Sequence, residues 1–263
     1  MQPNPLKQAL AQRRLVLGHM VMEFAVPNVA HLLAPLGLDF LLLDLEHTGL
    51  SLQTLAPILA SCHAIGLPAI VRVPGPWGHY VPRCLDLGAM GIMMPNVRSA
   101  DEARRFVEAA KYPPMGSRGM GLGGAQTGYQ LPDLRQYADW ANEQTVLVAQ
   151  IESPEAVEAI DDILSVPGID VGWVGQNDLT LNMGILGQFD DPRYIAARRR
   201  VAEACRSHDK SAGCQPTTLP LAREWFEAGY NMVSLGTDIR LYQQALREFL
   251  LAVRGFEAGR AEG

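Results

Sequence analysis

Short runs of apolar residues alternate along this chain with longer segments in which apolar residues recur every three or four positions. The short runs predict strands buried on both faces, and the longer segments predict amphipathic helices. We expect strands at 15–22, 40–45, 69–73, 91–94, 146–151, 171–174, 212–214 and 232–235, and helices at 28–36, 52–65, 80–87, 100–111, 154–164, 192–208, 219–228 and 239–253. This repetition is typical of an α/β fold with a parallel sheet.

Eight strand–helix units predict a closed (β/α)8 TIM barrel, since a doubly wound open sheet more often ends at five or six strands. The open sheet stays an alternative, because a sequence does not show closure. The 263 residues match the usual size of one barrel, about 250, so we expect a single domain spanning 1–263. Ser153, Pro154 and Glu155 give a cap, a first-position proline and a first-turn acid, which place Glu152 at a strand end.

The segment 112–142 is rich in Gly and Pro, and we interpret it as a long loop that covers a site. It contains Gly119, Gly121 and Gly124 at the spacing of a dinucleotide fingerprint. That fingerprint requires a strand directly before it and a helix opening directly after it. Neither is predicted here, so we expect no NAD site in this segment.

Composition and charge exclude several classes of protein. A net charge of -6 gives no basic surface for nucleic acid, and no segment is long and apolar enough to span a membrane. Four cysteines are scattered without a CxxC pair, which fits packed thiols in a reducing compartment. No signal-like apolar run follows the N-terminal charges. We therefore expect a cytoplasmic protein that binds neither nucleic acid nor membrane.

The predicted strand at 40–45 ends in three ionisable residues, Asp44, Glu46 and His47. In parallel sheets and barrels, ligands bind at the carboxyl ends of the strands, so this cluster is a candidate site. The alternative is that Asp44 caps the next helix, although Ser51 is the better cap. His47 is the only histidine at a predicted strand end, and we interpret it as a general base.

Glu152 and Asp178 follow the apolar runs at 146–151 and 171–174, which would be neighbours in a barrel. Two carboxylates and several waters commonly hold Mg²⁺ or Mn²⁺, with positions left open for substrate. The alternative is that Asp178 caps the next helix and Glu152 pairs with Arg72. The residues alone do not decide between these interpretations.

Arg72 stands between apolar residues, where its planar fork suits a carboxylate or an enolate oxygen. The alternative is that it only pairs with Asp44 or Glu46. The three lysines, Lys7, Lys111 and Lys210, lie outside the strand ends, so a Schiff-base mechanism lacks a nucleophile. These residues suit proton abstraction beside a carbonyl with a metal-held enolate, and aldol chemistry, enolisation and decarboxylation stay open.

Several motifs along the chain resemble the HpcH/HpaI aldolase family of metal-dependent class II pyruvate aldolases. They are GHMVMEF, FLLLDLEHTGLS, VRVPG, LDLGAMGIMMPNVRSADEA, KYPPMGSRG, AQIESPEAVE, VGWVGQNDLTLNMG and SLGTD. The resemblance implies a barrel of the phosphoenolpyruvate/pyruvate-domain type and a divalent metal, Mg²⁺ or Mn²⁺ and alternatively Co²⁺. It also implies reversible aldol chemistry, in which pyruvate or hydroxypyruvate and an aldehyde form a 4-hydroxy-2-oxoacid.

By position, the resemblance implies that Glu152 and Asp178 are the metal ligands and that His47 is a base acting through a metal-bound water. Asp86, which by itself reads as a surface acid, would raise the basicity of His47. Arg72 would stabilise the enolate and the aldehyde oxygen.

The resemblance assigns the 2-oxoacid to Gln150, with its carboxylate near the backbone of Asn177 and Asp178. It also implies a last helix packed on a neighbouring subunit, and hence a homo-oligomer, a trimer or hexamer. Two positions that bear on the substrate depart from the family pattern: Gln176-Asn177, where many members have Pro and a small residue, and Gln126, where Arg is common. A citrate-lyase-like or oxaloacetate-decarboxylase-like lyase, or a non-catalytic binding protein on the same barrel, are the alternatives.

Overall fold

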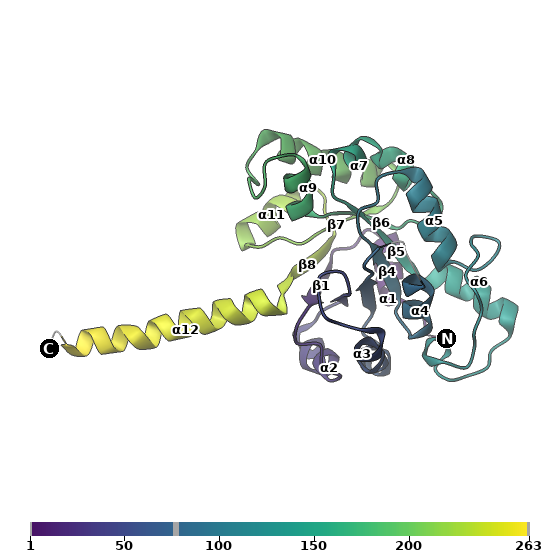
Figure 1. Cartoon of the computed structure of the whole chain (residues 1–263), viewed down its shortest axis with the longest axis horizontal. Coiled ribbons are helices and arrows are strands. Elements are labelled where there is room, and N and C mark those ends of the chain that lie inside the picture. Colours follow the sequence, from purple (N-terminus) through teal and green to yellow (C-terminus); the bar gives the residue numbers. More distant parts are fainter. Residues whose placement is uncertain (1, 76–78, 262–263) are drawn as a thin grey trace.

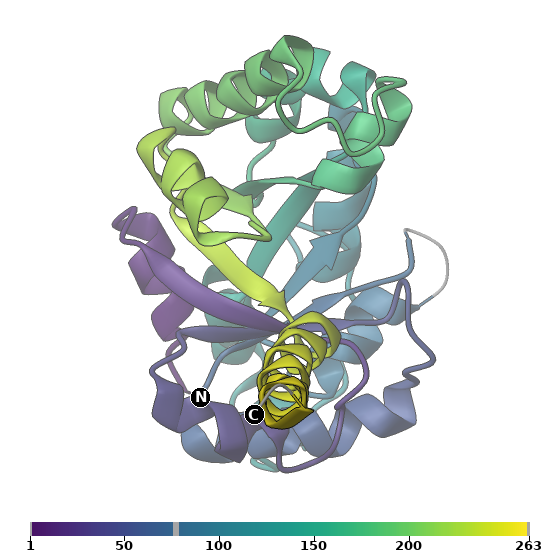
Figure 2. The same ribbon diagram turned by 90° about the vertical axis from the view of Figure 1, so that its left-hand side faces the viewer.

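The computed structural model describes residues 2–75 and 79–261. Its strands form a closed parallel barrel in which each strand pairs with the next along the chain and β8 pairs with β1 (Figures 1 and 2). The strands are β1 (Val16–Val21), β2 (Phe40–Asp44), β3 (Ala69–Arg72), β4 (Gly91–Met94), β5 (Val146–Ile151), β6 (Val171–Val174), β7 (Ser211–Cys214) and β8 (Met232–Thr237). The predicted (β/α)8 barrel is confirmed, and the open sheet is excluded.

Helices surround the barrel, and one further helix, α1, precedes β1 (Figure 1). They are α1 (Pro5–Ala11), α2 (Val29–Leu33), η1 (Ala34–Leu36), α3 (Leu52–Ile65), α4 (Tyr80–Asp86), α5 (Ala100–Ala110), η2 (Ala125–Thr127), α6 (Leu134–Gln144), α7 (Pro154–Glu158), α8 (Ile160–Leu164), α9 (Gln176–Asn182), α10 (Pro192–Ser207), α11 (Leu219–Glu227) and α12 (Asp238–Ala261). The predicted caps are present: the hydroxyls of Ser51 and Ser153 accept hydrogen bonds from Thr54 N and Ala156 N.

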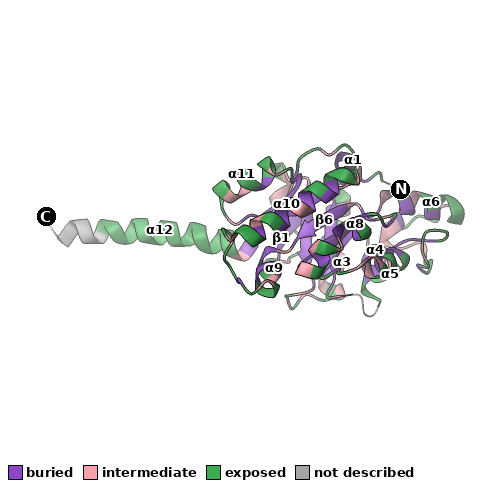
Figure 3. Cartoon of the chain, turned by 90° about the horizontal axis from the view of Figure 1, so that it is seen from above, coloured by how far each residue is buried: buried purple, intermediate pink, exposed green. Residues whose placement is uncertain are grey.

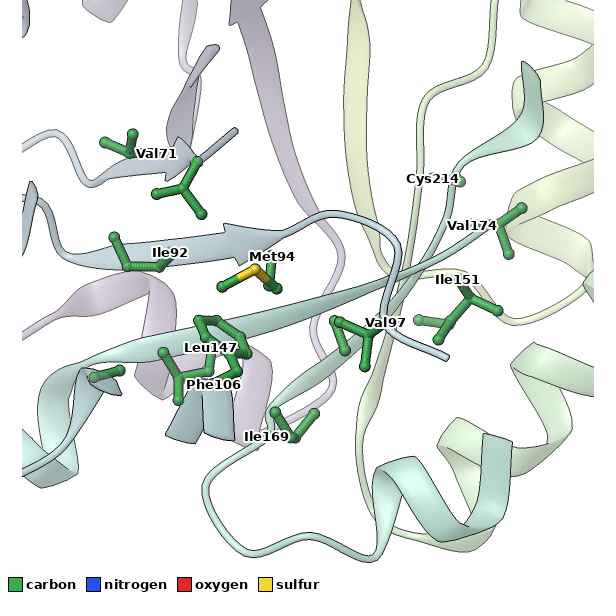
Figure 4. Packing of buried hydrophobic residues seen from close by; sticks show 14 of the residues in the cluster. Val71, Ile92, Met94, Val97, Phe106, Leu147, Ile151, Ile169, Val174 and Cys214 are labelled. Carbon is green, nitrogen blue, oxygen red and sulfur yellow. The ribbon is translucent and has the colours of Figure 1, made fainter. Parts of the chain in front are cut away.

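Two layers of apolar side chains hold the barrel together. Phe40 and Leu42 point into the barrel interior, which α1 closes from below through Leu6 and Leu10. Alternate residues such as Leu41 point outward into the larger layer between strands and helices. Figure 4 shows part of that layer, and Figure 3 shows the buried strands inside an exposed outer shell. Both faces of the strands are therefore buried, as the continuous apolar runs predicted, except at the end of β8, where Leu235 is exposed.

The predicted loop over 112–142 is wrong at its C-terminal end, because α6 occupies Leu134–Gln144. Asp133 caps this helix by accepting from Gln136 N at 2.9 Å. Tyr137, Ala138 and Ala141 then recur at helical spacing on its buried face. The Gly- and Pro-rich composition extends only to Pro132, so averaging over the whole segment hid the helix. The fingerprint-like glycines do lie in loop between α5 and η2.

The last helix, α12, projects away from the barrel as a long arm (Figure 1). Its described side chains are mostly exposed (Figure 3), and several of them are large and apolar. They are Leu241, Tyr242, Leu246, Phe249, Leu250, Leu251, Val253 and Phe256. Within residues 2–75 and 79–261, none of the helices combines the length and hydropathy of a membrane span.

Candidate active site at the carboxyl ends of the strands

Asp44, Arg72 and Glu46 form a buried ion-pair cluster at the ends of β2 and β3. Arg72 donates from Nε and Nη2 to the two oxygens of Asp44, both at 2.8 Å. Its Nη1 lies 3.2 Å from Glu46 Oε2. Burial alone would lower the pKa of Arg72, but the hydrogen bonds and charge of Asp44, with the charge of Glu46, raise it. Arg72 is therefore held rigidly in place, and both ion pairs of the alternative interpretation are present.

His47 lies at the rim of this cluster. Its side chain is 56% exposed, and its Nε2 is 3.6 Å from Glu46 Oε2. The backbone N–H groups of Glu46 and His47 donate to Asp44, which fixes the turn after β2. Asp44 thus orients the turn and does not cap α3, whose cap is Ser51. An accessible imidazole beside a carboxylate is suited to accept a proton.

Glu152, at the end of β5, is 4% exposed and held on both oxygens. Its Oε2 accepts from Asn96 N at 2.9 Å, and its Oε1 accepts from Gln150 Nε2 at 2.6 Å. Gly175, at the end of β6, makes room for it, because a Cβ there would lie 2.1 Å from Glu152 Oε1. Among the described residues no ion pair joins Glu152 to Arg72, so Glu152 is free for another cation.

Burial, followed by the charges of Asp178 and Glu46, raises the pKa of Glu152 to about 8. Asp178 lies in the first turn of α9, whose cap is Gly175, and within the described chain it makes no side-chain capping hydrogen bond. The alternative interpretation required an ion pair between Glu152 and Arg72 and a helix cap at Asp178. The described residues contain neither. Glu152 and Asp178 are coupled electrostatically at one side of the barrel mouth, as two ligands of one cation would be.

The donor set fits a cation such as Mg²⁺ or Mn²⁺. Over 2–75 and 79–261, no group of three or more His, Cys, Asp and Glu side chains could hold a metal unaided. Two carboxylates with water and substrate completing the shell is the usual arrangement for these ions. Two buried side-chain oxygens near the pair also lack a hydrogen-bond partner within the described residues: Gln150 Oε1 and Gln176 Oε1. Buried oxygens without a donor are uncommon, and a bound metal's water shell or substrate would supply the missing donors.

Asp86 lies apart from this cluster. It is the last residue of α4, and its Oδ1 accepts from Arg118 Nη2 at 2.6 Å. The ion pairs found in the described chain join His47 to Glu46 and not to Asp86. Within the described residues of one chain, no ion pair joins Asp86 to His47. The expected effect of Asp86 on the basicity of His47 therefore stays a prediction.

The two departures from the family pattern lie in different places. Gln176 is buried at the start of α9, beside the site, and Asn177 next to it is exposed. Gln126 lies in η2, against a cavity that Met90 and Thr145 also line. Those two residues directly precede β4 and β5, so this is the opposite face of the barrel. Within one chain, the absence of arginine at 126 does not change the barrel mouth.

Sequence reasoning missed three contributions to the site. Asn96, which follows β4, orients Glu152 through its backbone, and no side-chain type announces such a role. Gly175 was not singled out, although a glycine directly before a candidate acid is a signal for close packing. Glu46 was noted but given no role, and it lies between Arg72 and His47.

Comparison with known proteins gives the family. The HpcH/HpaI aldolase/citrate lyase model matches residues 20–245, most of the chain. The chain belongs to this family. These matches confirm the predicted family and the predicted barrel. They also confirm the predicted class of enzyme, an aldolase and therefore a lyase.

This chain aligns with several known proteins over nearly the whole length of both. The chain is 34% identical over 257 residues to the 4-hydroxy-2-oxo-heptane-1,7-dioate aldolase of Shigella sonnei, covering 97% of this chain and 96% of that protein. It is 32% identical over 249 residues to the hydroxypyruvate/pyruvate aldolase of Roseovarius nubinhibens, covering 94% and 95%. The crystal structure of an HpcH/HpaI aldolase from Desulfitobacterium hafniense superimposes with a TM-score of 0.90 at 29% identity, covering 95% and 96%.

Proposed function

We propose that this aldolase joins pyruvate or hydroxypyruvate to an aldehyde, giving a 4-hydroxy-2-oxoacid, and catalyses the reverse cleavage with a divalent cation. The observation that carries the proposal is the buried carboxylate of Glu152, confined by Gly175 and coupled to Asp178. The names of the similar aldolases support the donor and the reaction.

Glu152 and Asp178 would hold the cation, with Mg²⁺ or Mn²⁺ preferred over Co²⁺ because the ligands are carboxylate oxygens. Bound there, it would act as a Lewis acid on the 2-oxo group of the donor and so acidify the neighbouring C–H. Gln150 orients Glu152 through its amide N–H, and within the described residues its own oxygen has no hydrogen-bond partner. The donor carboxylate is assigned to the start of α9, at Asn177 and Asp178.

His47 accepts the proton that leaves the methyl carbon of the donor, and its exposure lets it return that proton to solvent or product. The enolate carbon then forms a bond to the aldehyde carbon, whose oxygen takes the electron pair. Arg72 is fixed by Asp44 through Nε and Nη2, and its remaining N–H groups would donate to that oxygen, which becomes the 4-hydroxyl after protonation. Cleavage runs through the same residues in reverse.

The test is proton–deuterium exchange at the pyruvate methyl, followed by NMR with Mn²⁺ or Mg²⁺ and with EDTA. We expect exchange that depends on the cation and is lost in Glu152→Ala and reduced at least 100-fold in His47→Ala. Full exchange in EDTA, or in either variant, would refute the proposed roles. Asp86→Asn in the same assay shows whether Asp86 acts on His47 at all.

We also propose that the protein is a cytoplasmic homo-oligomer, a trimer or hexamer, in which α12 packs on a second copy. The exposed apolar side chains of α12 support this assembly. The four cysteines support a reducing compartment, since all are buried and, within the described residues, unpaired. Light scattering should show a multimer that Leu246→Lys with Phe249→Lys disrupts, and a monomeric wild type would refute the assembly.

A further inference from the structure

Asp238, the first residue of α12, binds two parts of the chain at once. It is 7% exposed. Its Oδ2 accepts hydrogen bonds from Met22 N, Glu23 N and Phe24 N at 3.0, 2.9 and 2.7 Å. Its Oδ1 accepts from Ile239 N in its own helix at 2.8 Å and from Met22 N at 3.1 Å. One carboxylate therefore holds three successive amides of the loop after β1 together with the start of α12.

Backbone amides alone neutralise this carboxylate, because within 2–75 and 79–261 Asp238 forms no ion pair. Successive amides that converge on one anion form a nest, and hydrogen bonds to an ionised group are stronger than neutral ones. The ring of Phe24 also packs edge-on against Tyr242 in α12, with centroids 5.3 Å apart. The loop and the helix are therefore joined at two points.

The loop after β1 stands at the mouth of the barrel, across from the cation ligands. The side chain of Met22 packs against the inner apolar cluster, beyond Met20 along the same strand direction. β1 and β8 run side by side to the base of α12 (Figure 2), and β1 lies across the barrel from β5, which Glu152 follows. Gln215, after β7, donates to the carbonyl of Gly236 in β8 at 3.1 Å. The ends of β7, β8 and β1 thus form one wall of the mouth.

The proposed reaction leaves this wall to the aldehyde. His47, Arg72, Glu152 and Asp178 lie at or just after the ends of β2, β3, β5 and β6, and the loop after β4 holds Glu152 through Asn96 N. These groups surround the donor and its proton, and the proton transfer uses no group from β7, β8 or β1. The aldehyde approaches the donor carbon through the mouth, so its far end meets the remaining wall. This step rests on the proposed function.

We propose that Asp238 is a positioning residue for the aldehyde half of the reaction. It touches neither the donor nor the aldehyde. Its carboxylate fixes the backbone of 22–24 and so sets where Met22 stands in the wall that the aldehyde meets. Because the same carboxylate starts α12, the orientation of that helix and the shape of the wall are linked.

Two assays on Asp238→Ala separate the two halves of the reaction. Cation-dependent exchange at the pyruvate methyl reports the donor half alone, whereas addition of pyruvate to glycolaldehyde, glyceraldehyde or propanal, followed by NMR, requires both. We expect exchange within about twofold of the wild type and at least a tenfold loss in kcat/KM for the aldehyde, mostly through a higher KM. Full aldol activity, or an equal loss in both assays, would overturn the proposal.

Two further variants separate positioning from general damage. Asp238→Asn keeps the shape and one acceptor oxygen, so we expect an intermediate loss in the aldehyde assay, and it carries the comparison if Asp238→Ala does not fold. Asp191→Ala removes the cap of α10, which accepts from Arg193 N at 2.8 Å, and is the matched control that should leave both assays unchanged. An effect of equal size in Asp191→Ala would contradict a role specific to Asp238.

Hydrogen–deuterium exchange followed by mass spectrometry tests the structural step directly. The amides of 22–24 should exchange at least tenfold faster in Asp238→Ala than in the wild type and in Asp191→Ala. Unchanged protection of these amides would refute the positioning role. The outcome for the wild type keeps the two proposals apart: no cation-dependent exchange at pyruvate refutes the proposed function, whereas exchange without addition to any of the three aldehydes refutes the assignment of this wall.

Discussion

Replacing Glu152 by Gln should stabilise the cation-free protein at neutral and alkaline pH, although it removes a proposed ligand. The folded chain raises the pKa of Glu152 from its ordinary 4.5 to about 8. A folded state that binds a proton more tightly than the unfolded state loses stability as pH rises between those two values. The contribution of Glu152 to the free energy of unfolding is therefore fully present below about pH 4.5, declines as pH rises from there, and is lost above about pH 8.

The magnitude follows from the width of the interval. At pH 7 the carboxyl is 2.5 units above its ordinary pKa, which at about 1.36 kcal/mol per unit costs the wild type about 3 kcal/mol. Gln has the same shape but only one acceptor oxygen, whereas two donors, Asn96 N and Gln150 Nε2, point at this side chain. The variant therefore loses one hydrogen bond, which costs about 1 kcal/mol. The net gain of about 2 kcal/mol corresponds to a rise in Tm of roughly 5 °C.

The assay is thermal and urea unfolding in EDTA from pH 5 to pH 8. The stability of Glu152→Gln minus that of the wild type should be near zero or negative at pH 5 and should grow with pH. Glu158→Gln, at an exposed position on α7, is the matched control for loss of a carboxylate. Curves that stay parallel for the wild type and Glu152→Gln across this range would refute the burial argument.

Three further predictions concern the same region. Affinity for Mn²⁺ should rise about tenfold per pH unit from 5 to 7, because the cation displaces the proton from Glu152, and calorimetry showing a flat response would contradict this. Gly175→Ala should reduce cation-dependent exchange at least 100-fold, since its Cβ would displace Glu152, whereas Gly49→Ala, with open space around it, should not; equal rates would contradict the packing. Asp44→Asn should cost about 3 kcal/mol in urea unfolding, because it leaves Arg72 buried with one fewer charged partner, and a loss below 1 kcal/mol would argue against the cluster.

The barrel was predictable because its strands obey a strong local rule. Runs such as FLLLD have no polar face, and a strand buried on both sides needs none. β4, β5 and β6 begin and end where the apolar runs do. Helices with little sequence contrast were missed: α1 and α9 are each seven residues long, and α6 follows a Gly-rich segment.

The positions of site residues were predictable where an ionisable residue ends a strand, as Arg72 does, or directly follows one, as Glu152 does. It was not predictable where a contact depends on which face a residue occupies. Asp86 and Gln126 lie on helical turns whose orientation comes only from packing, and the sequence does not place them relative to His47. Backbone donors such as Asn96 N could not be predicted either, because any residue except proline has a backbone N–H.

The register between β5 and β6 has a consequence for engineering. Gln150 lies opposite Trp173 and Ile151 opposite Val174, so the ladder fixes where Glu152 meets Gly175. Exchange of loops other than the one after β4, whose Asn96 N holds Glu152, leaves that spacing unchanged. Directed-evolution libraries confined to the loop after β7 can therefore search for new aldehyde acceptors while the contact between Glu152 and Gly175 stays constant.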